Sequence, residues 1–187
     1  MAKIGLNNFR YAKATIDAET GVVTYENCKT PAKAISFSFE PTLSDASLYA
    51  DDGLAERDSS VTGGDVTMGI DREDLETLAD MLGHTYANNE IIDDVADVAP
   101  YVGVGRVTTL MVDNERKYRA TVLSLVKFEE PSEEDNTTGE SVEFSTTEIS
   151  GKMAIPASGK WRHRKMFDSK TSAISYIEGL LSTSVSI

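Results

Sequence analysis

The chain has 187 residues, of which 31 are acidic and 18 are basic, so its formal net charge at pH 7 is −13. A single cysteine, Cys28, excludes an internal disulfide and a cysteine zinc cluster, and two histidines leave few ligands for any other metal site, so we expect no metal and no cofactor. The acidic balance argues against a tight grip on nucleic acid, and no apolar run approaches the ~18 residues of a membrane span. With 40% hydrophobic residues, residues 1–187 are expected to form one globular domain.

The first third of the chain has the pattern of strands. Phe9–Ile16 and Val22–Glu26 flank Asp17–Gly21, a turn-rich connection that is typical of a hairpin. Apolar and polar residues alternate over Ile35–Glu40, which predicts a half-buried strand that ends at the following proline. Thr42–Gly64 is rich in Ser, Asp, Ala and Gly and has no sustained period, so we expect a long loop, a kind of segment that is usually functional.

The middle of the chain combines a helix with a long hairpin. Asp71 is expected to cap a helix that ends at Gly83, because apolar residues between them follow helical spacing. Tyr101–Val112 and Arg116–Phe128 are predicted strands joined by a short polar turn. The second of them contains Val122–Val126, which is apolar on both faces, so this strand is expected to be buried twice, inside one subunit or against another.

The last third returns to strand and ends with a helix. Glu129–Ser141 is a charged excursion rich in breaker residues, and Val142–Ile155 is a predicted strand with a bulge near Thr146–Glu148. Ser169 is expected to cap a second amphipathic helix, and Ser182–Ile187 to be a flexible tail. The sequence therefore predicts a mainly β protein with two helices.

Charge is distributed unevenly along the chain. Residues 61–115 have 2 basic and 12 acidic side chains, a net charge of −10, whereas residues 116–187 have 10 of each. The last third also contains a basic cluster, which consists of Arg162, His163, Arg164 and Lys165. Two interpretations are open: the acidic segment is a solvated face, or it is complementary to the basic cluster of another copy of the chain.

The sequence contains no constellation that is typical of an enzyme. No serine-elbow motif occurs, and neither histidine has an acid or a candidate nucleophile next to it. His84 follows the expected end of a helix, where a cation is favoured, so we expect a structural role for it. His163 is expected to be a surface charge, and Gly103-Val104-Gly105 a site of close packing or strand bending. We therefore expect no enzymatic activity.

Six short segments are more informative together than any one of them is alone. They are Gly5-Leu6-Asn7-Asn8-Phe9, Ser36-Phe37-Ser38-Phe39-Glu40-Pro41, Leu48-Tyr49-Ala50-Asp51-Asp52-Gly53, Thr67-Met68-Gly69-Ile70-Asp71, Ala99-Pro100-Tyr101-Val102-Gly103-Val104-Gly105 and Lys160-Trp161-Arg162. In this order, and over nearly the whole chain up to about Leu181, they resemble the phage major tail protein. That family supplies the tail-tube subunit of long-tailed, non-contractile phages of Gram-positive bacteria.

The resemblance implies a fold and an assembly. The fold would be a β-sandwich or barrel of the tail-tube type, with one flanking α-helix and a C-terminal helix. The assembly would be hexameric rings stacked into a hollow tube for DNA. Thr42–Gly64 would be the loop between rings, and the strands over Tyr101–Phe128 part of the wall. The candidate residues are Leu48, Tyr49, Asp51 and Asp52 in the loop, Val104, Val122 and Leu125 in the wall strands and interface, and Arg162, Arg164 and Lys165 in a basic patch between subunits.

The resemblance also implies partners and a location. It implies a virion protein assembled in the bacterial cytoplasm, with tape measure, tail terminator and distal tail or baseplate proteins as partners and DNA as transiting cargo. Besides a hydrolase with an unrecognised pair of carboxylates, which would need a concave pocket, two alternatives remain open. One is the tube protein of a related bacterial killing or secretion particle. The other is a soluble β-sandwich binding module, which the aromatic content of 7% and the lone Trp161 disfavour.

Overall fold

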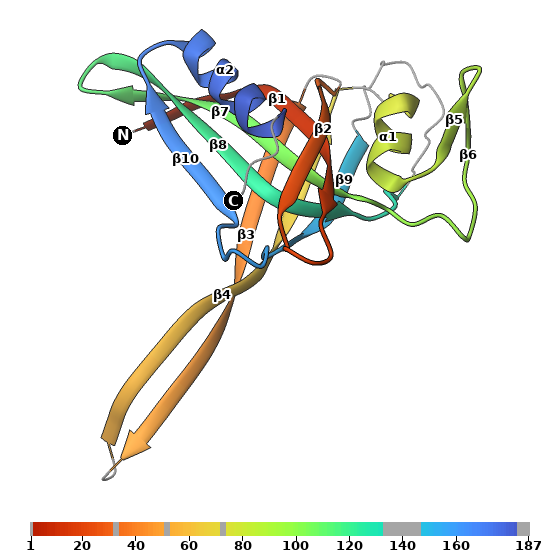
Figure 1. The fold of residues 1–187 in the computed structure, drawn as a ribbon. Coiled ribbons are helices and arrows are strands. Elements are labelled where there is room, and N and C mark those ends of the chain that lie inside the picture. The colour runs from red at the N-terminus through yellow and green to blue at the C-terminus, as the bar shows by residue number, and fades with distance from the viewer. Residues whose placement is uncertain (1, 32–33, 51–52, 72–73, 133–146, 183–187) are drawn as a thin grey trace, which may run out of the picture.

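The computed structural model describes residues 2–31, 34–50, 53–71, 74–132 and 147–182. It is a mainly β protein with one large antiparallel sheet of eight strands, a separate two-stranded hairpin and two helices, the second near the C-terminus (Figure 1). The strands of the large sheet are β1 (Ala2–Ile16), β2 (Val23–Lys29), β3 (Ala34–Ala50), β4 (Gly53–Ile70), β7 (Tyr101–Val112), β8 (Glu115–Phe128), β9 (Thr147–Ala154) and β10 (Arg162–Phe167). Their order is β2-β1-β7-β8-β9-β4-β3, and β10 pairs with β8.

Strand β8 is the point at which the sheet branches. Its first part pairs with β10 as far as Leu123, and its last part pairs with β9 from Leu125 onward. Ser124 lies between the two and is fully buried. Its amide donates to the Trp161 carbonyl at 3.0 Å, its hydroxyl to the Lys160 carbonyl at 2.9 Å, and its own carbonyl accepts from the Tyr25 hydroxyl. Ser124, which pairs with neither β9 nor β10, therefore has a hydrogen-bond partner for each of its polar groups.

Two hydrophobic cores lie on opposite faces of the central strands. One lies inside the curved sheet and includes Leu123 and Val126 of β8. The other lies under the C-terminal helix and includes Val122 and Leu125 of the same strand. The prediction that this strand is buried twice is confirmed, and the chain itself provides both coverings.

Helix α2 (Lys170–Leu181) packs on a groove that glycine creates in β7. Ala173, Ile177 and Leu181 form its fully buried stripe, and Ser169 is its N-cap residue, as the sequence predicts. A Cβ atom at Gly105 would overlap the side chain of Ile177. The close packing expected at this glycine is therefore confirmed, because only a residue without a side chain lets the helix approach the strand.

Helix α1 (Leu75–Leu82) is shorter than the sequence predicts. Asp74, not Asp71, is its N-cap residue and has an extended backbone, so the helix begins at Leu75. Its end at Gly83 is confirmed: this glycine has φ of +87°, and its amide donates to the Ala79 carbonyl. After α1 comes a hairpin that the sequence analysis missed, β5 (Thr85–Ala87) and β6 (Glu90–Ile92), which turns through two left-handed asparagines.

The other predicted hairpins are present. Strands β1 and β2 meet at a turn in which Gly21 has positive φ, and β7 and β8 meet at a two-residue turn of Asp113 and Asn114, both left-handed. Of the segments predicted after β8, residues 133–146 lie outside the described residues. From Thr147 onward β9 pairs with β4 without a register shift. The expected tail also lies outside, except for Ser182, the residue that follows α2.

Candidate functional site

The segment Thr42–Gly64 is not a loop but the outer part of a long hairpin. Strand β3 continues through Pro41, and β3 and β4 remain paired up to Ala50 and Gly53. The hairpin projects well beyond the body of the molecule (Figure 1). The expectation was wrong because polar residues on both faces remove the alternation that marks a strand, and because a proline is tolerated on an edge strand such as β3.

The outer part of this hairpin, residues 42–63, is named here the distal hairpin. Strand β4 pairs with β9 only from Gly64 onward, so within the part of the chain that the structure describes the two strands of the distal hairpin have only each other as neighbours in the sheet. Leu43 is 57% exposed, and the Ser44 and Ser60 hydroxyls bond across the strands at 2.8 Å. The candidate contacts Leu48 and Tyr49 lie near its tip, paired with Glu56 and Leu54. The candidates Asp51 and Asp52 lie outside the described residues.

The candidate wall residues are core residues of this chain. Val104, Val122 and Leu125 are at most 2% exposed, the first inside the curved sheet and the other two beneath α2. They stabilise the two strands that were predicted to form the wall. They are not available as contacts to another subunit, because the same chain covers both faces of these strands.

Strand β10 divides the predicted basic patch between two faces of the sheet. The guanidinium of Arg162 lies 4.3 Å from the Trp161 ring centroid, on the face of the curved core, and Arg164 shares that face by the alternation of the strand. The Lys165 ammonium lies on the other face, between the rings of Phe167 and Tyr176. His163 is not the expected surface charge: its Nε2 is buried, and burial lowers its pKa.

Two further arginines, which the sequence analysis missed, join Arg162 and Arg164. In the register of β7, β8 and β10, Arg106 and Arg164 both lie beside Thr121, and Arg119 is two residues from it on the same face. We name these four arginines the arginine face. The Arg106 guanidinium is stacked 3.9 Å from the Phe37 ring centroid. Burial, followed by the charges of Arg119 and Arg162, lowers the pKa of Arg106 to about 10.

No counter-ion for the arginine face occurs among the described residues. None of the four arginines forms an ion pair with a carboxylate in that part of the chain, and the Nε of Arg119 and the hydroxyl of Thr121 are buried without hydrogen-bond partners. Beside them is a hollow of about 270 Å³, lined by the start of β1 from Lys3 to Leu6 and by Phe37, Arg106, Thr108 and Arg119. A concentration of partly buried positive charge without a partner is costly and favours an anion.

The hairpin β5–β6 and the segment after it, residues 85–98, form an arm that is attached through His84. The His84 Nδ1 lies 2.8 Å from a carboxylate oxygen of Asp97, and its Nε2 lies 2.6 Å from Glu130 and 3.6 Å from Asp93. The hydrogen bond to Asp97 raises the pKa of His84, Glu130 and Asp93 add to the effect, and burial opposes it. The expected structural role of His84 has a specific form: its ring contacts three acidic side chains, Asp93 and Asp97 of the arm and Glu130 after β8.

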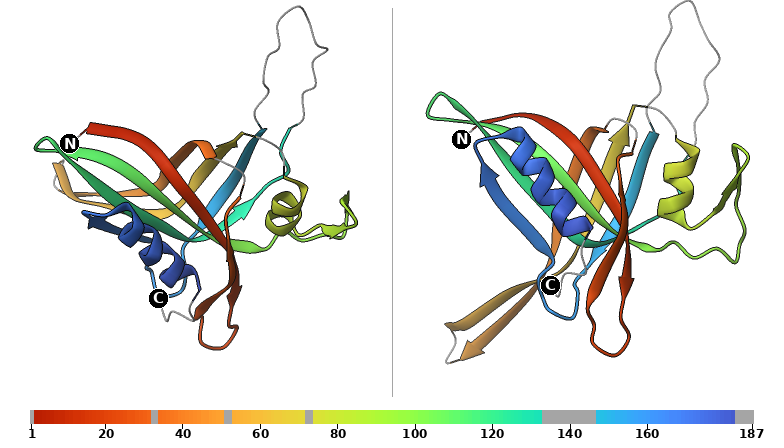
Figure 2. Two further views of the ribbon diagram at one scale, coloured as in Figure 1. Left: turned by 90° about the horizontal axis from the view of Figure 1, so that it is seen from above. Right: turned by 45° about the horizontal axis from the view of Figure 1, so that its top comes forward.

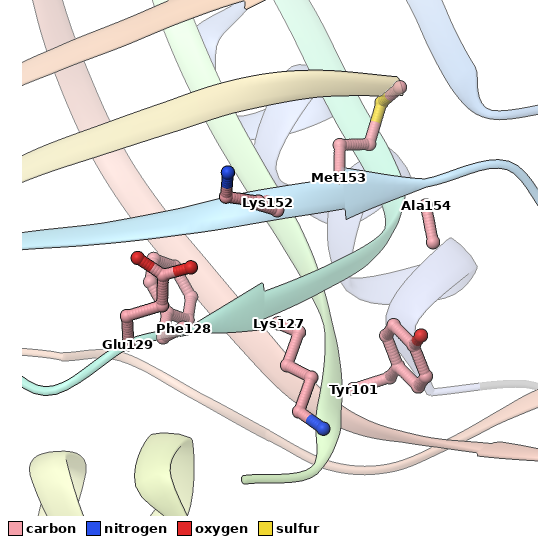
Figure 3. A pocket seen from close by; sticks show the side chains of 7 residues that line it. All are labelled: Tyr101, Lys127, Phe128, Glu129, Lys152, Met153 and Ala154. Atoms are coloured by element: carbon pink, nitrogen blue, oxygen red, sulfur yellow. The ribbon is translucent and has the colours of Figure 1, made fainter. Parts of the chain in front are cut away.

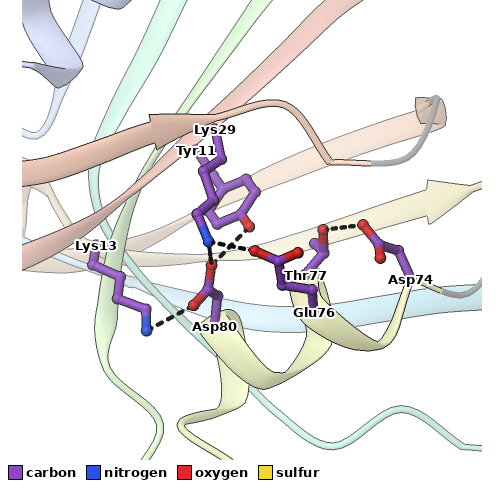
Figure 4. Close-up of polar contacts among 7 residues, drawn as sticks. All are labelled: Tyr11, Lys13, Lys29, Asp74, Glu76, Thr77 and Asp80. Carbon is purple, nitrogen blue, oxygen red and sulfur yellow. Dashed lines mark hydrogen bonds and ion pairs between the residues drawn. The ribbon is translucent and has the colours of Figure 1, made fainter. Parts of the chain in front are cut away.

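A second polar cluster attaches α1 to the β1–β2 hairpin (Figure 4). The Asp80 carboxylate accepts from the ammonium groups of Lys13 at 2.8 Å and Lys29 at 2.6 Å, and from the Tyr11 hydroxyl at 3.1 Å. Burial raises the pKa of Asp80, but the two lysines outweigh it, and the pKa lies below its ordinary value. Lys29 also pairs with Glu76 at 2.9 Å. These charges neutralise part of the acidic middle segment within the subunit.

A second hollow, of about 240 Å³, lies between the ends of β8 and β9 (Figure 3). Its lining consists of Tyr101, Lys127, Phe128, Glu129, Lys152, Met153 and Ala154. Lys127 and Lys152 are direct neighbours across the two strands and are both exposed. The hollow is smaller than the ~300–1,000 Å³ of typical small-molecule sites, and its lining does not pair a nucleophile with a base.

The described residues contain neither a candidate metal cluster nor a helix that could span a membrane. There, no group of three or more His, Cys, Asp or Glu side chains is arranged to hold a metal ion. None of the helices in that part of the chain is long and apolar enough to cross a membrane. No match is found when the sequence is compared with protein-family models and with curated proteins.

Proposed function

We propose that this chain is a tail-tube subunit of a long-tailed, non-contractile phage. It would be a structural virion protein, without enzymatic activity, that assembles into stacked hexameric rings around a channel for DNA. The ordered resemblance that runs to about Leu181 supports the proposal, and so does the mainly β fold with its C-terminal helix. The finer description of the fold, a β-sandwich or barrel of the tail-tube type, belongs to the same proposal.

The distal hairpin is the observation that carries the proposal. A two-stranded ribbon is at best marginally stable alone in water, because it buries little apolar surface. Here the ribbon extends far from the body, its outer edges have no neighbour among the described residues, and the described side chains of its base are mostly exposed. An ordered ribbon of this kind fits insertion between other subunits, which is the role the resemblance assigns to Thr42–Gly64.

The body of the subunit favours association through edges rather than faces. Both faces of its central strands are covered by the chain's own cores. Strands β2 and β3 are the two ends of the large sheet, and an open sheet edge is a template for pairing with another chain. A ring that closes through such edges removes them, and head-to-tail contacts that repeat along an axis extend the ring into a tube.

The charge of the chain fits a channel through which DNA passes without binding. Six copies would carry 6 × −13 = −78 charges per ring. A lumen of the same sign as the phosphate backbone repels it, so DNA slides. The acidic segment 61–115 is our first candidate for the lumen surface, apart from those carboxylates that its own subunit pairs, such as Asp80. Tape measure, tail terminator and distal tail or baseplate proteins would be the partners in the virion.

A tube protein of a related bacterial killing or secretion particle would share the distal hairpin, and the present observations favour neither source. The binding-module alternative finds less support. Stacking on sugars needs exposed aromatic rings, and among the side chains that the structure describes, which do not include Tyr49, the one aromatic ring with large exposure is Tyr86, at 36%. Trp161 packs against Phe39 and Arg162 instead.

Negative-stain electron microscopy with light scattering tests the proposal. The purified full chain is expected to form rings or tubes of uniform diameter as its concentration is raised, alone or with tail assembly partners. A protein that stays a 20.3 kDa monomer under all of these conditions would contradict the proposal. Rings with a basic lumen would contradict the sliding argument while leaving the assembly in place.

A further inference from the structure

The arginine face and the arm are complementary in chemistry. The arginine face has four cations with no carboxylate partner among the described residues and a hollow that includes the ring of Phe37. The arm has exposed carboxylates at Glu90, Asp93 and Asp94, interleaved with exposed apolar side chains. Its most exposed apolar residues are Ile92 at 55%, Val98 at 72% and Val95, which is fully exposed. An acidic segment with a protruding valine fits a basic hollow with an aromatic wall.

The two surfaces lie at opposite ends of the molecule. The hollow is built from the start of β1, near the label N, together with β7 and β8, and β10 lies beside it; the arm, β5–β6, is at the other end in both Figure 1 and Figure 2. The arm therefore cannot reach the arginine face of its own chain. A second copy placed head to tail could bring the two together, and repetition of this contact gives a ring or a filament.

Other anions are weaker candidates for this surface. Nucleic acid would have to approach a protein with a net charge of −13, and a free phosphate would leave the exposed apolar residues of the arm without a partner. The arm of another copy supplies both the carboxylates and the apolar contact. Arginine suits such a partner, because its planar fork pairs with a carboxylate through two parallel hydrogen bonds.

We propose that the arm of one copy binds the arginine face of the next, with Asp93 and Asp94 paired to Arg106 and Arg119 and with Val95 placed beside Phe37. This contact specifies which surfaces join within the self-assembly, so it rests on the proposed function. It also brings the acidic middle segment of one copy to a surface of the next copy to which β10 contributes Arg162 and Arg164. Lys165 takes no part in it, because it faces α2.

Charge reversal tests the contact. The variant Asp93→Lys/Asp94→Lys and the variant Arg106→Glu/Arg119→Glu are each expected to weaken self-association about 100-fold or more, measured by analytical ultracentrifugation. In each pure variant the two residues of the arm and the two residues of the arginine face have the same sign at every contact. In an equimolar mixture, the arm of each variant can bind the arginine face of the other, where the signs are opposite. Mixing is therefore expected to restore association. If the arginine variant does not fold, Asp94→Lys alone keeps the test decisive, because it leaves the ion pair between Asp93 and His84 in place. Association of the arm variant at the wild-type concentration would overturn the proposal.

Cross-linking tests the geometry independently of the charges. On a Cys28→Ser background, Val95→Cys and Ile4→Cys in one chain are expected to give a ladder of disulfide-linked oligomers under mild oxidation, because Ile4 lines the hollow. A mixture of the two single variants should give only dimers. The matched control is Val95→Cys with Ile16→Cys, since Ile16 is a similarly exposed residue at the other end of β1 and should give no ladder.

The combined results separate this proposal from the proposed function. Tubes without the Val95–Ile4 cross-link would overturn the contact and leave the tail-tube function standing. The cross-linked ladder without tubes would support the contact and contradict the function, and a monomer without cross-links would contradict both. Thermal stabilisation by inorganic phosphate or a short DNA duplex, lost in the arginine variant and not accompanied by the ladder, would assign the face to another anion and overturn the contact.

Discussion

The inner and outer parts of the β3–β4 hairpin belong to the same two strands but differ in what holds them. The inner part pairs with β9 and places Val66, Met68 and Ile70, none of them exposed, in the core of the curved sheet. Among the described residues the distal hairpin has no third strand; its Leu43 is 57% exposed, and Val61 at its base packs against the core. The inner part is thus stabilised by burial within the subunit, whereas the distal hairpin beyond Val61 depends on hydrogen bonds between its two strands.

Because of this difference, the inner part and the distal hairpin need different residue types. Alternating large apolar residues are needed where a strand covers a core, and they mark the inner part of the hairpin. A segment that awaits a partner must remain soluble before assembly, which favours small and polar residues on both faces. The absence of periodicity in Thr42–Gly64 is what a ribbon exposed in the free subunit requires.

Shortening the hairpin is the change with the largest expected effect on assembly. Replacing residues 43–62 by Asn-Gly joins Thr42 to Gly63, which already face each other, through a favoured hairpin turn. We expect the monomer to keep its thermal midpoint within a few degrees and to lose tube growth completely, as seen by electron microscopy. A graded control, in which only residues 48–56 are replaced, should leave shorter or less stable tubes. Failure of the first variant to fold would place the distal hairpin in the core of the subunit.

A matched pair of leucine substitutions sharpens the same contrast. Leu123→Ala empties space in the buried sheet and is expected to lower the free energy of unfolding by about 2–5 kcal/mol. Leu43→Ala removes an exposed side chain of the distal hairpin and is expected to change the free energy of unfolding by less than about 0.5 kcal/mol. Urea denaturation of the unassembled protein measures both. Tube formation is expected to show the opposite order: relative to the free energy of unfolding that each variant loses, Leu43→Ala should reduce tube formation more than Leu123→Ala. If both substitutions lowered the free energy of unfolding equally, the contrast between the buried sheet and the distal hairpin would be contradicted.

The features predicted from the sequence were those set by local chemistry. Turn residues marked the β1–β2 and β7–β8 hairpins, Gly83 marked the end of α1, and the double apolar run marked β8. The distal hairpin was mistaken for a loop because its strands pair through backbone hydrogen bonds, which leave no periodic pattern of apolar side chains. The β5–β6 hairpin was missed because the two asparagines at its turn, Asn88 and Asn89, are its main sequence signal.

The arginine face could not be derived from the sequence because it depends on which strands become neighbours. The register of the predicted β7–β8 hairpin would place Arg106 near Arg119. That Arg162 and Arg164 join them depends on β10 pairing with the first part of β8 while β9 pairs with the last part. The change occurs at the buried Ser124, whose hydrogen bonds come from segments distant in sequence. Similarly, the acids around His84 are brought to it by the fold.

The arm is a second appendage, which packs Ile91 against the core and, unlike the distal hairpin, is also held by a titratable contact. The pKa of His84 is raised and that of Asp97 is lowered by their mutual hydrogen bond, with Glu130 and Asp93 as the other charged groups that face the ring. A raised histidine pKa stabilises the folded arm below the unfolded value of about 6.5, and this contribution is lost as pH rises through the folded pKa. A lowered aspartate pKa stabilises it above about 3.9 and is lost as pH falls further.

The smallest expected effect is therefore a pH dependence confined to the arm. Amide hydrogen exchange in residues 90–97, corrected for intrinsic rates, is expected to show the strongest protection between about pH 4 and 6.5 and less at pH 8, with the core strands unchanged. His84→Gln should remove this dependence, because glutamine bonds to the acids without titrating. NMR titration separates the two histidines, since the pKa of His84 is raised and that of His163 is lowered by burial. Arm protection that is constant from pH 5 to 8 would mean that the β5–β6 pairing and the packing of Ile91 hold the arm without a contribution from the charge of His84.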